Sequence, residues 1–229
     1  MNKIFTLCMI LVSLSNAKDL RILVYGDSNT YGLRADFSFM RYEIKDTWSE
    51  IMADELGDDY AVITEGLNGR TVNLNNTSKV SKDNKINAKL YSNGTMLLPS
   101  ILASHTPLDL LIIMLGTNDL GEHDAKQIAK DLGKLIDIAK LERFNIPNVL
   151  LIAPPKLNIG RKGGDILLSR STDLPALLSK ICEQKDAYFY NAQEVVEFAH
   201  GQDKLHFSKD DHHALGKAVA KQVQKIFEN

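Results

Sequence analysis

Three side chains from opposite ends of the sequence have the chemical types that nucleophilic catalysis needs. Ser28 lies in the stretch YGDSNTYG at residues 25–32, whereas Asp203 and His206 lie close to the C-terminus. A serine hydroxyl is a weak nucleophile unless a neighbouring base takes its proton, and an imidazole, with a pKa of about 6.5, suits that task. The imidazolium then needs an anion at its other nitrogen. These residue types predict Ser28 as nucleophile, His206 as base and Asp203 as the orienting acid.

Attack of a serine on a carbonyl group produces a tetrahedral oxyanion, which preorganised N–H donors stabilise by roughly 3 to 4 kcal/mol each. We expect these donors to be the backbone N–H of Ser28, the backbone N–H of Gly69 and the side-chain amide of Asn118. Glycine permits a close backbone approach and unusual dihedral angles. Asparagine is a neutral donor that does not compete for the proton of the nucleophile.

The motifs that carry these residues also have an ordinary structural interpretation. They are Gly26-Asp27-Ser28-Asn29, Gly66-Leu67-Asn68-Gly69-Arg70, Gly116-Thr117-Asn118-Asp119 and Asp203-Lys204-Leu205-His206. Such residues are favoured in turns because their side chains bond to nearby backbone or because glycine tolerates unusual dihedral angles. Four unrelated turns, however, need not supply a nucleophile, a base, an orienting acid and oxyanion donors together. The combination therefore favours catalysis.

The elements that must bring these motifs together alternate along the chain. The run from Leu110 to Leu115 is apolar throughout, as in a strand covered on both faces. Alternating strands and helices predict a three-layer, doubly wound (flavodoxin-like) α/β fold, a parallel sheet of about five strands with helices on both faces. Its functional crevice should lie at the carboxyl ends of the strands. Strands are expected at 21–25, 60–64, 108–115, 148–153 and 188–190, and helical spacing recurs within 48–56, 128–139, 177–181 and 214–227.

The composition is that of one globular domain. The chain has 229 residues, of which 44% are hydrophobic and 24% charged, and nothing in this balance indicates a second domain. The formal net charge of −2, with lysines spread along the chain, argues against nucleic acid as a partner. The least regular segments, 73–87 and 156–170, either shape a substrate entrance or are ordinary surface loops.

Residues 1–17 have the pattern of a secretory signal peptide. Lys3 is followed by an apolar segment over 4–14 and by small residues at 15–17. About eleven apolar residues are too few to span a bilayer as a helix, which takes roughly 20, so cleavage is favoured over an uncleaved anchor. We expect a periplasmic or secreted protein whose single domain covers 18–229 and is not inserted in a membrane.

Taken together, the four motifs resemble the four blocks of the SGNH, or GDSL-type, hydrolase family, in the family's order and from about Arg21 to the C-terminus. Segment 65–71 and the run over 97–119 resemble its arylesterase and acyltransferase branch. That branch hydrolyses small acyl esters and can pass the acyl group to alcohols. The resemblance implies a serine esterase that acts on a small acyl ester without a cofactor or metal. It leaves a homo-oligomer open, since close relatives associate.

Carried over residue by residue, the resemblance implies Ser28 as nucleophile, Asp203 and His206 as the family's Asp-x-x-His pair, and Gly69 and Asn118 in the oxyanion hole. Relatives often have other small residues around Gly69, which leaves open which backbone N–H faces the oxyanion. The natural substrate is open as well. Lysophospholipids, thioesters and O-acetylated polysaccharides of the cell envelope are alternatives to small aryl or acetyl esters.

Three other protein classes fit less well. A metal-dependent phosphoesterase would draw its ligands from Asp27, Asn118, Asp119, His206, His212 and His213. No two histidines have the i, i+4 spacing of a helical zinc pair, and we expect the adjacent His212 and His213 to decorate the last helix. An α/β-hydrolase would have a G-x-S-x-G elbow, but Thr30 stands at the fifth position. A binding protein of this fold would not need Ser28, Asp203 and His206 intact.

Arg70 and Asp27 are the candidate substrate-binding residues beside these side chains. Arg70, together with Arg34, has the guanidinium needed to grip an anionic substrate group near the mouth of the crevice. The alternative for an isolated arginine is a surface salt bridge. Asp27 directly precedes the predicted nucleophile.

Overall fold

The computed structural model describes residues 19–74, 92–160 and 163–228, so the expected signal segment lies outside the described residues. At its centre is a five-stranded parallel sheet with the strand order β2-β1-β3-β4-β5. The strands are β1 (Leu20–Gly26), β2 (Tyr60–Gly66), β3 (Leu110–Met114), β4 (Asn148–Ala153) and β5 (Tyr188–Asn191). All five lie where the sequence predicts them.

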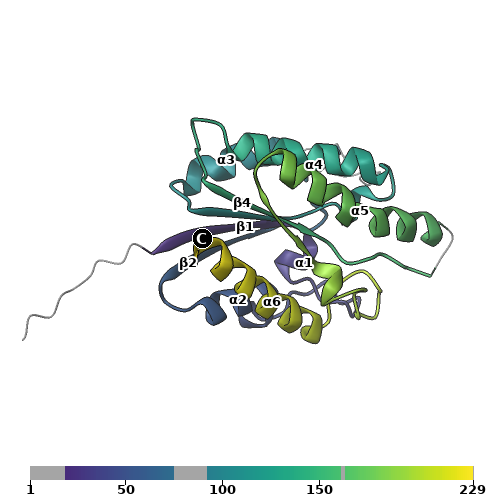
Figure 1. The fold of residues 1–229 in the computed structure, drawn as a ribbon. Coiled ribbons are helices and arrows are strands. Elements are labelled where there is room, and N and C mark those ends of the chain that lie inside the picture. The colour runs from purple at the N-terminus through teal and green to yellow at the C-terminus, as the bar shows by residue number, and fades with distance from the viewer. Residues whose placement is uncertain (1–18, 75–91, 161–162, 229) are drawn as a thin grey trace, which may run out of the picture.

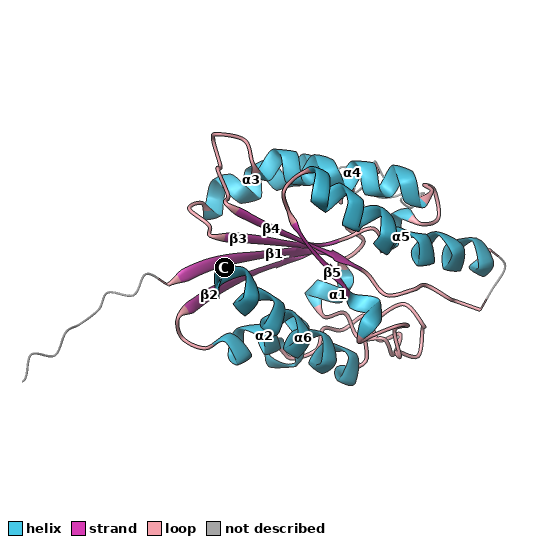
Figure 2. Cartoon of the chain, in the orientation of Figure 1, coloured by secondary structure: helices cyan, strands magenta, loops and turns pink. Residues whose placement is uncertain are grey.

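Helices cover both faces of this sheet (Figure 1). One face is covered by α3 (Gly94–His105), α4 (Ala125–Ala139) and α5 (Gly164–Gln184), and the other by α2 (Trp48–Leu56) and α6 (Lys209–Glu228). The short helix α1 (Ser28–Tyr31) follows β1 on the side of α6. The same three layers are seen in Figure 2, and they confirm the predicted doubly wound α/β fold.

Alternate residues of the central strands enter two separate cores. Leu23 and Tyr25 of β1 pack with α3, α4 and α5, whereas Ile22 and Val24 pack with α2 and α6. Strand β3 is buried along its whole length, which explains why its sequence is apolar without alternation. This two-sided burial fixes the strand ends from which the polar turns start.

Helix α4 illustrates how the sequence sets an element's start and its buried face. The Asp124 side chain accepts the N–H of Gln127 at 2.8 Å and so caps the helix. Ile128, Leu132 and Leu135 then recur at helical spacing and are buried against the sheet. No helix in the described part of the chain is both long and apolar enough to cross a membrane.

The helical content exceeds the expectation from sequence in two places. No helix is predicted over α3, yet the side chain of Asn93 caps it through the N–H of Met96 at 3.2 Å. The prediction of an irregular segment over 156–170 is wrong for its second part, since α5 begins at Gly164. The other irregular segment, 73–87, lies mostly outside the described residues.

Candidate active site

The carboxyl ends of the strands gather the polar motifs at one edge of the sheet. Gly26 at the end of β1 is in register with Gly66 of β2 on one side and with Met114 of β3 on the other. The turns after these three strands therefore start side by side. Residues that are far apart in the sequence, such as Ser28 and Asn118, follow neighbouring strand ends.

Ser28 opens α1 on a tight turn after β1. The turn is capped by Asp27, whose Oδ1 accepts the N–H of Asn29 at 2.9 Å. Gly66 lets α1 approach the neighbouring strand, because a Cβ there would lie only 2.3 Å from the backbone nitrogen of Tyr31. Ser28 is 7% exposed, so its hydroxyl is held in a largely buried position.

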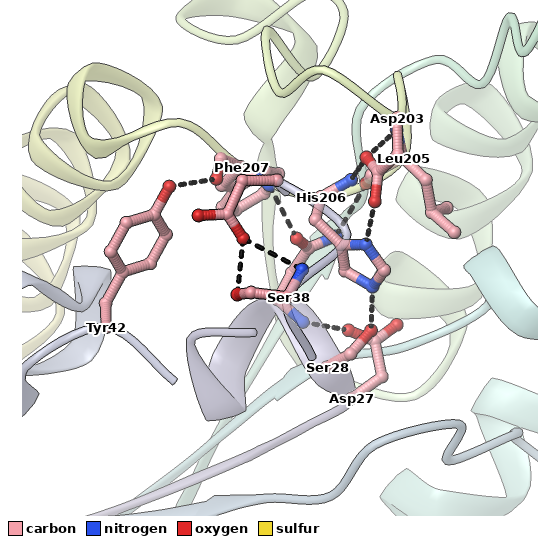
Figure 3. Close-up of polar contacts among 10 residues, drawn as sticks. Asp27, Ser28, Ser38, Tyr42, Asp203, Leu205, His206 and Phe207 are labelled. Atoms are coloured by element: carbon pink, nitrogen blue, oxygen red, sulfur yellow. Dashed lines mark hydrogen bonds and ion pairs between the residues drawn. The ribbon is translucent and has the colours of Figure 1, made fainter. Parts of the chain in front are cut away.

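His206 reaches Ser28 from the loop before α6 (Figure 3). Its Nε2 lies 3.0 Å from Oγ of Ser28, and its Nδ1 lies 2.5 Å from Oδ2 of Asp203. Oδ1 of the same carboxylate accepts the backbone N–H groups of Leu205 and His206 at 2.9 and 2.8 Å. Asp203 therefore shapes the loop and contacts the ring at once. The structure brings together the three side chains that the sequence selects.

Hydrogen bonds keep Asp203 in its charged form. Burial alone would raise the pKa of this carboxyl, but the bonds from His206 and Leu205 outweigh it and hold the pKa below its usual range. A carboxylate at Nδ1 favours the imidazole tautomer whose Nε2 is free to accept a proton. The arrangement can therefore take a proton from the hydroxyl of Ser28.

Gly69 and Asn118 come from the turns after β2 and β3. Gly69 has a φ of 72°, the left-handed region in which glycine is favoured. Asn118 lies in the 3-10 helix η3 (Thr117–Asp119), and its amide Nδ2 donates to the carbonyl of Arg70 at 3.0 Å. The two candidate oxyanion donors are thus tied together by a bond between their turns, and an amide nitrogen has a second N–H to offer.

Asp119 is a buried residue that the sequence indicates as part of a polar motif and as a possible metal ligand, without a further role. Both of its carboxylate oxygens lie 3.0 Å from the backbone nitrogen of Val72. The side chain therefore fastens the turn after β3 to the segment that follows Gly69. Asp119 is 1% exposed, and burial raises its pKa to about 7.

Arg70 does not lie at the mouth of a crevice. It is 2% exposed, and its guanidinium donates to the carbonyls of Gly26, at 2.9 Å, and Glu65. The guanidinium carbon also lies 4.0 Å from the centre of the Tyr25 ring. Arg70 joins the ends of β1 and β2, so the predicted position and the alternative of a surface salt bridge are both wrong. Arg34 does form a surface ion pair, with an N···O distance of 2.6 Å.

Asp27 is also buried, with 2% of its surface exposed. One carboxylate oxygen is occupied by the N–H of Asn29. Burial raises the pKa of Asp27 to about 6, against the lowering effects of that bond and of the nearby His206 and Arg70. The contacts are those of a helix cap and differ from the expected substrate-binding position.

The two adjacent histidines of α6 have different environments. His213 is exposed, as expected, but His212 is fully buried and its Nδ1 accepts the N–H of Trp48 at 3.1 Å. Burial lowers the pKa of His212 to about 4, and the neutral ring joins α6 to the start of α2. Within the described residues, no group of three or more His, Cys, Asp or Glu side chains is arranged to hold a metal ion.

Asn29 is the neighbour of Ser28 whose contacts the sequence least reveals. It is 4% exposed, and its side-chain amide bonds to the backbone of Leu205 and Phe207, on either side of His206. Leu205 and Phe207 are about as distant from Asn29 in the sequence as His206 is from Ser28. From the sequence, Asn29 is recognised only as part of the Gly26-Asp27-Ser28-Asn29 motif, because no local pattern indicates a partner at that distance.

Comparisons with known proteins support the family resemblance. Residues 24–215 match the GDSL-like Lipase/Acylhydrolase family, which is the resemblance that the four motifs indicate. No curated protein sequence matches the chain.

Several solved structures have the same fold. Est24, a carbohydrate acetylesterase from Sinorhizobium meliloti, is 31% identical with a TM-score of 0.79, over 90% of this chain and 99% of its own. An aryl esterase from M. smegmatis is 30% identical with a TM-score of 0.75, over 90% and 99%. A carbohydrate acetylesterase family member from Sinorhizobium meliloti is 26% identical with a TM-score of 0.77, over 92% and 100%.

Proposed function

Because the chain belongs to the GDSL-like lipase/acylhydrolase family and is a carboxylic ester hydrolase, we propose that Ser28, His206 and Asp203 are its catalytic triad. The observation that carries this proposal is the pair of contacts at the imidazole of His206. Ser28 Oγ lies 3.0 Å from one ring nitrogen and the carboxylate of Asp203 lies 2.5 Å from the other. This is the order of nucleophile, base and orienting acid that acyl transfer needs.

In the first half of the reaction, Ser28 Oγ attacks the carbonyl carbon of the ester while Nε2 of His206 takes its proton. The carboxylate of Asp203 stabilises the imidazolium that forms. The negative charge develops on the former carbonyl oxygen, where the N–H groups of Ser28 and Gly69 and the amide of Asn118 are the proposed donors. His206 then gives its proton to the departing alkoxide, and the acyl group remains on Ser28.

In the second half, water attacks the acylated serine. His206 takes a proton from the water, the tetrahedral intermediate forms again, and its collapse returns the proton to Ser28 Oγ and releases the carboxylic acid. An alcohol in place of water would give a new ester. Acyl transfer is therefore part of the proposal, and product analysis with an added alcohol measures the partition between acid and ester.

The proposed substrates are small acyl esters, in the first place acetyl esters of aryl or carbohydrate alcohols. The solved relatives support this choice, since they include an aryl esterase and carbohydrate acetylesterases. A panel of p-nitrophenyl esters of increasing acyl length, with an acetylated sugar and a lysophospholipid, tests it. A preference for the lysophospholipid would favour the lysophospholipase alternative instead.

Replacement of Ser28 by alanine is the decisive experiment. Because the S28A variant lacks the attacking oxygen, kcat for p-nitrophenyl acetate should fall by roughly 10³- to 10⁶-fold. Mass spectrometry of the acid-quenched wild-type enzyme should locate one acetyl group on the peptide that contains Ser28. The matched control is Ser38→Ala, since Ser38 is an exposed serine bonded to Asp36. Near-normal turnover by S28A would remove the proposed mechanism.

The proposal includes export of the chain, which rests on the signal-like pattern of residues 1–17. Fractionation of cells that express the full chain or a variant without residues 2–17 tests it. Export predicts activity outside the cytoplasm for the full chain only. The mass of the exported protein reports whether the segment has been removed.

A further inference from the structure

The side chain of Asn29 joins the turn that carries Ser28 to the loop that carries His206. Its Nδ2 donates to the carbonyl of Leu205 at 3.2 Å, and its Oδ1 accepts the N–H of Phe207 at 3.0 Å. The two bonds flank His206 in the chain, one on each side. Asn29 itself is held in α1, where its own N–H donates to Asp27.

These two bonds constitute most of the direct polar connection between α1 and this loop. Among the described residues, the one other hydrogen bond that joins them is that between Ser28 and His206. Other supports reach the loop from outside: Tyr42 donates to the carbonyl of Phe207 at 3.4 Å, and a Cβ on Gly201 would lie 2.1 Å from Cβ of Ala35. Those contacts hold the loop, but neither of them joins it to α1.

We propose that Asn29 is a positioning residue that sets the separation between Ser28 Oγ and His206 Nε2 through its two bonds to the backbone around His206. The proposal rests on the triad proposed above. Asn29 touches no reacting atom and acts through the placement of the base. Asp203 already fixes the ring relative to its own loop, so the remaining freedom is the position of that whole loop relative to α1.

A leucine in place of Asn29 would be branched at the same side-chain carbon but would have no polar atom, so it could make neither of these two bonds.

The test compares Asn29→Leu and Asn29→Ala with wild type. Both variants lose the bridge, and a displacement of about 1 Å in a catalytic group costs on the order of 100-fold. We expect kcat for p-nitrophenyl acetate to fall by roughly 10- to 100-fold with KM changed by less than about threefold. The rate at which an organophosphonate labels Ser28 should fall in parallel, since that reaction also needs His206 as base.

The matched control is Thr30→Val, one residue further along α1. Thr30 is fully buried like Asn29, but its hydroxyl has no hydrogen-bond partner among the described residues. This variant should keep the wild-type kcat. Thermal unfolding followed by circular dichroism gives the folded fraction of each variant, and rates are compared per folded molecule at a temperature below all the transitions.

A spectroscopic signature separates misplacement from collapse of the loop. The Nδ1 proton of His206 bonds to Asp203 within the loop, so its low-field proton resonance should persist in both Asn29 variants. A folded Asn29→Leu or Asn29→Ala protein with wild-type kcat would overturn the positioning role. Loss of the resonance together with activity would also overturn it, in favour of a purely structural role. If S28A itself retained activity, the proposed triad would fail, whatever the Asn29 variants do.

Discussion

The base side of Ser28, formed by residues 203–207, and the oxyanion side, formed by residues 69–72 with 118–119, each contain a carboxylate. On the base side the carboxylate is charged and its hydrogen bonds lie within one short loop. On the oxyanion side a buried carboxylate joins two turns. Asp203 accepts bonds from its own loop and has a lowered pKa. Asp119 bonds to Val72 in another turn, and burial raises its pKa to about 7. The base side is therefore organised by a permanent charge, and the oxyanion side by a group whose charge changes near neutral pH.

The difference shows that two carboxylates of one site can have separate tasks. The charge of Asp203 contacts the imidazole and can compensate a positive charge as it forms. The carboxyl of Asp119 contacts only backbone, so its contribution is to the position of the main chain beside Gly69. Neutralising the first should affect mainly the rate, and neutralising the second mainly stability and its dependence on pH.

The largest effect that sharpens this comparison is expected for Asp203→Asn. The substitution keeps the shape of the side chain but removes the charge that stabilises the imidazolium and favours its tautomer. We expect kcat to fall by roughly 10³- to 10⁴-fold with little change in KM. Steady-state kinetics with p-nitrophenyl acetate measure this. A loss of less than tenfold would mean that the base side does not work through the charge of Asp203.

A smaller effect is expected on the oxyanion side for Asn118→Ala. Removal of one oxyanion donor costs about 10²- to 10³-fold in kcat, and KM should change little because the bond is made mainly in the transition state. The variant also loses the bond to the carbonyl of Arg70, so its melting temperature is measured alongside. If KM rose while kcat stayed constant, Asn118 would bind the substrate in its ground state instead.

The smallest effect on rate and the clearest effect on pH dependence are expected for Asp119→Asn. The folded-state pKa of Asp119 is about 7 and the unfolded value is about 3.9. At pH values between these two pKa values, the carboxyl of Asp119 is protonated to a greater extent in the folded protein than in the unfolded chain. The contribution of Asp119 to the free energy of unfolding is therefore full below pH ~4 and is lost as the pH rises to about 7. An asparagine does not titrate, so the variant lacks this loss.

Urea unfolding of wild type and Asp119→Asn at several pH values between about 4 and 8 measures this contribution as a difference. His212, whose pKa is lowered to about 4, changes stability in the opposite direction over the same range. Asp27, with a pKa of about 6, acts in the same direction as Asp119. Both groups are present in the two proteins, so their effects largely cancel in the difference. Parallel stability curves would contradict the role assigned to the charge of Asp119.

The sequence predicts the sheet because the signals for buried strands are local. Leu110 to Met114 is continuously apolar since helices cover both faces of β3. Helix α3 is not predicted from the sequence. It contains Gly94 and Pro99, which are unfavourable in a helix, and the cap at Asn93 and the packing of Leu98 and Leu102 against the core compensate for them. Tertiary burial overrides local propensity there.

Of the candidate site, the sequence predicts the residues whose chemistry is distinctive, and not those whose importance depends on burial. Ser28, Asp203 and His206 can be selected by type, and the structure brings them together. Arg70 looks like an exposed cation in the sequence, but its partners are backbone carbonyls, which have no sequence signature. Asn29 is missed for the same reason.

Ser28 and its hydrogen-bond partner His206 are 178 positions apart in the sequence, and this separation has a consequence for biosynthesis. The ribosome makes the turn with the hydroxyl well before the loop with the imidazole and its carboxylate, which directly precedes α6. The nascent chain therefore contains Ser28 without its hydrogen-bond partner until residue 206 has been made. The contact between Ser28 and His206 can form only when the loop over 203–207 has left the ribosome and has docked against the rest of the domain.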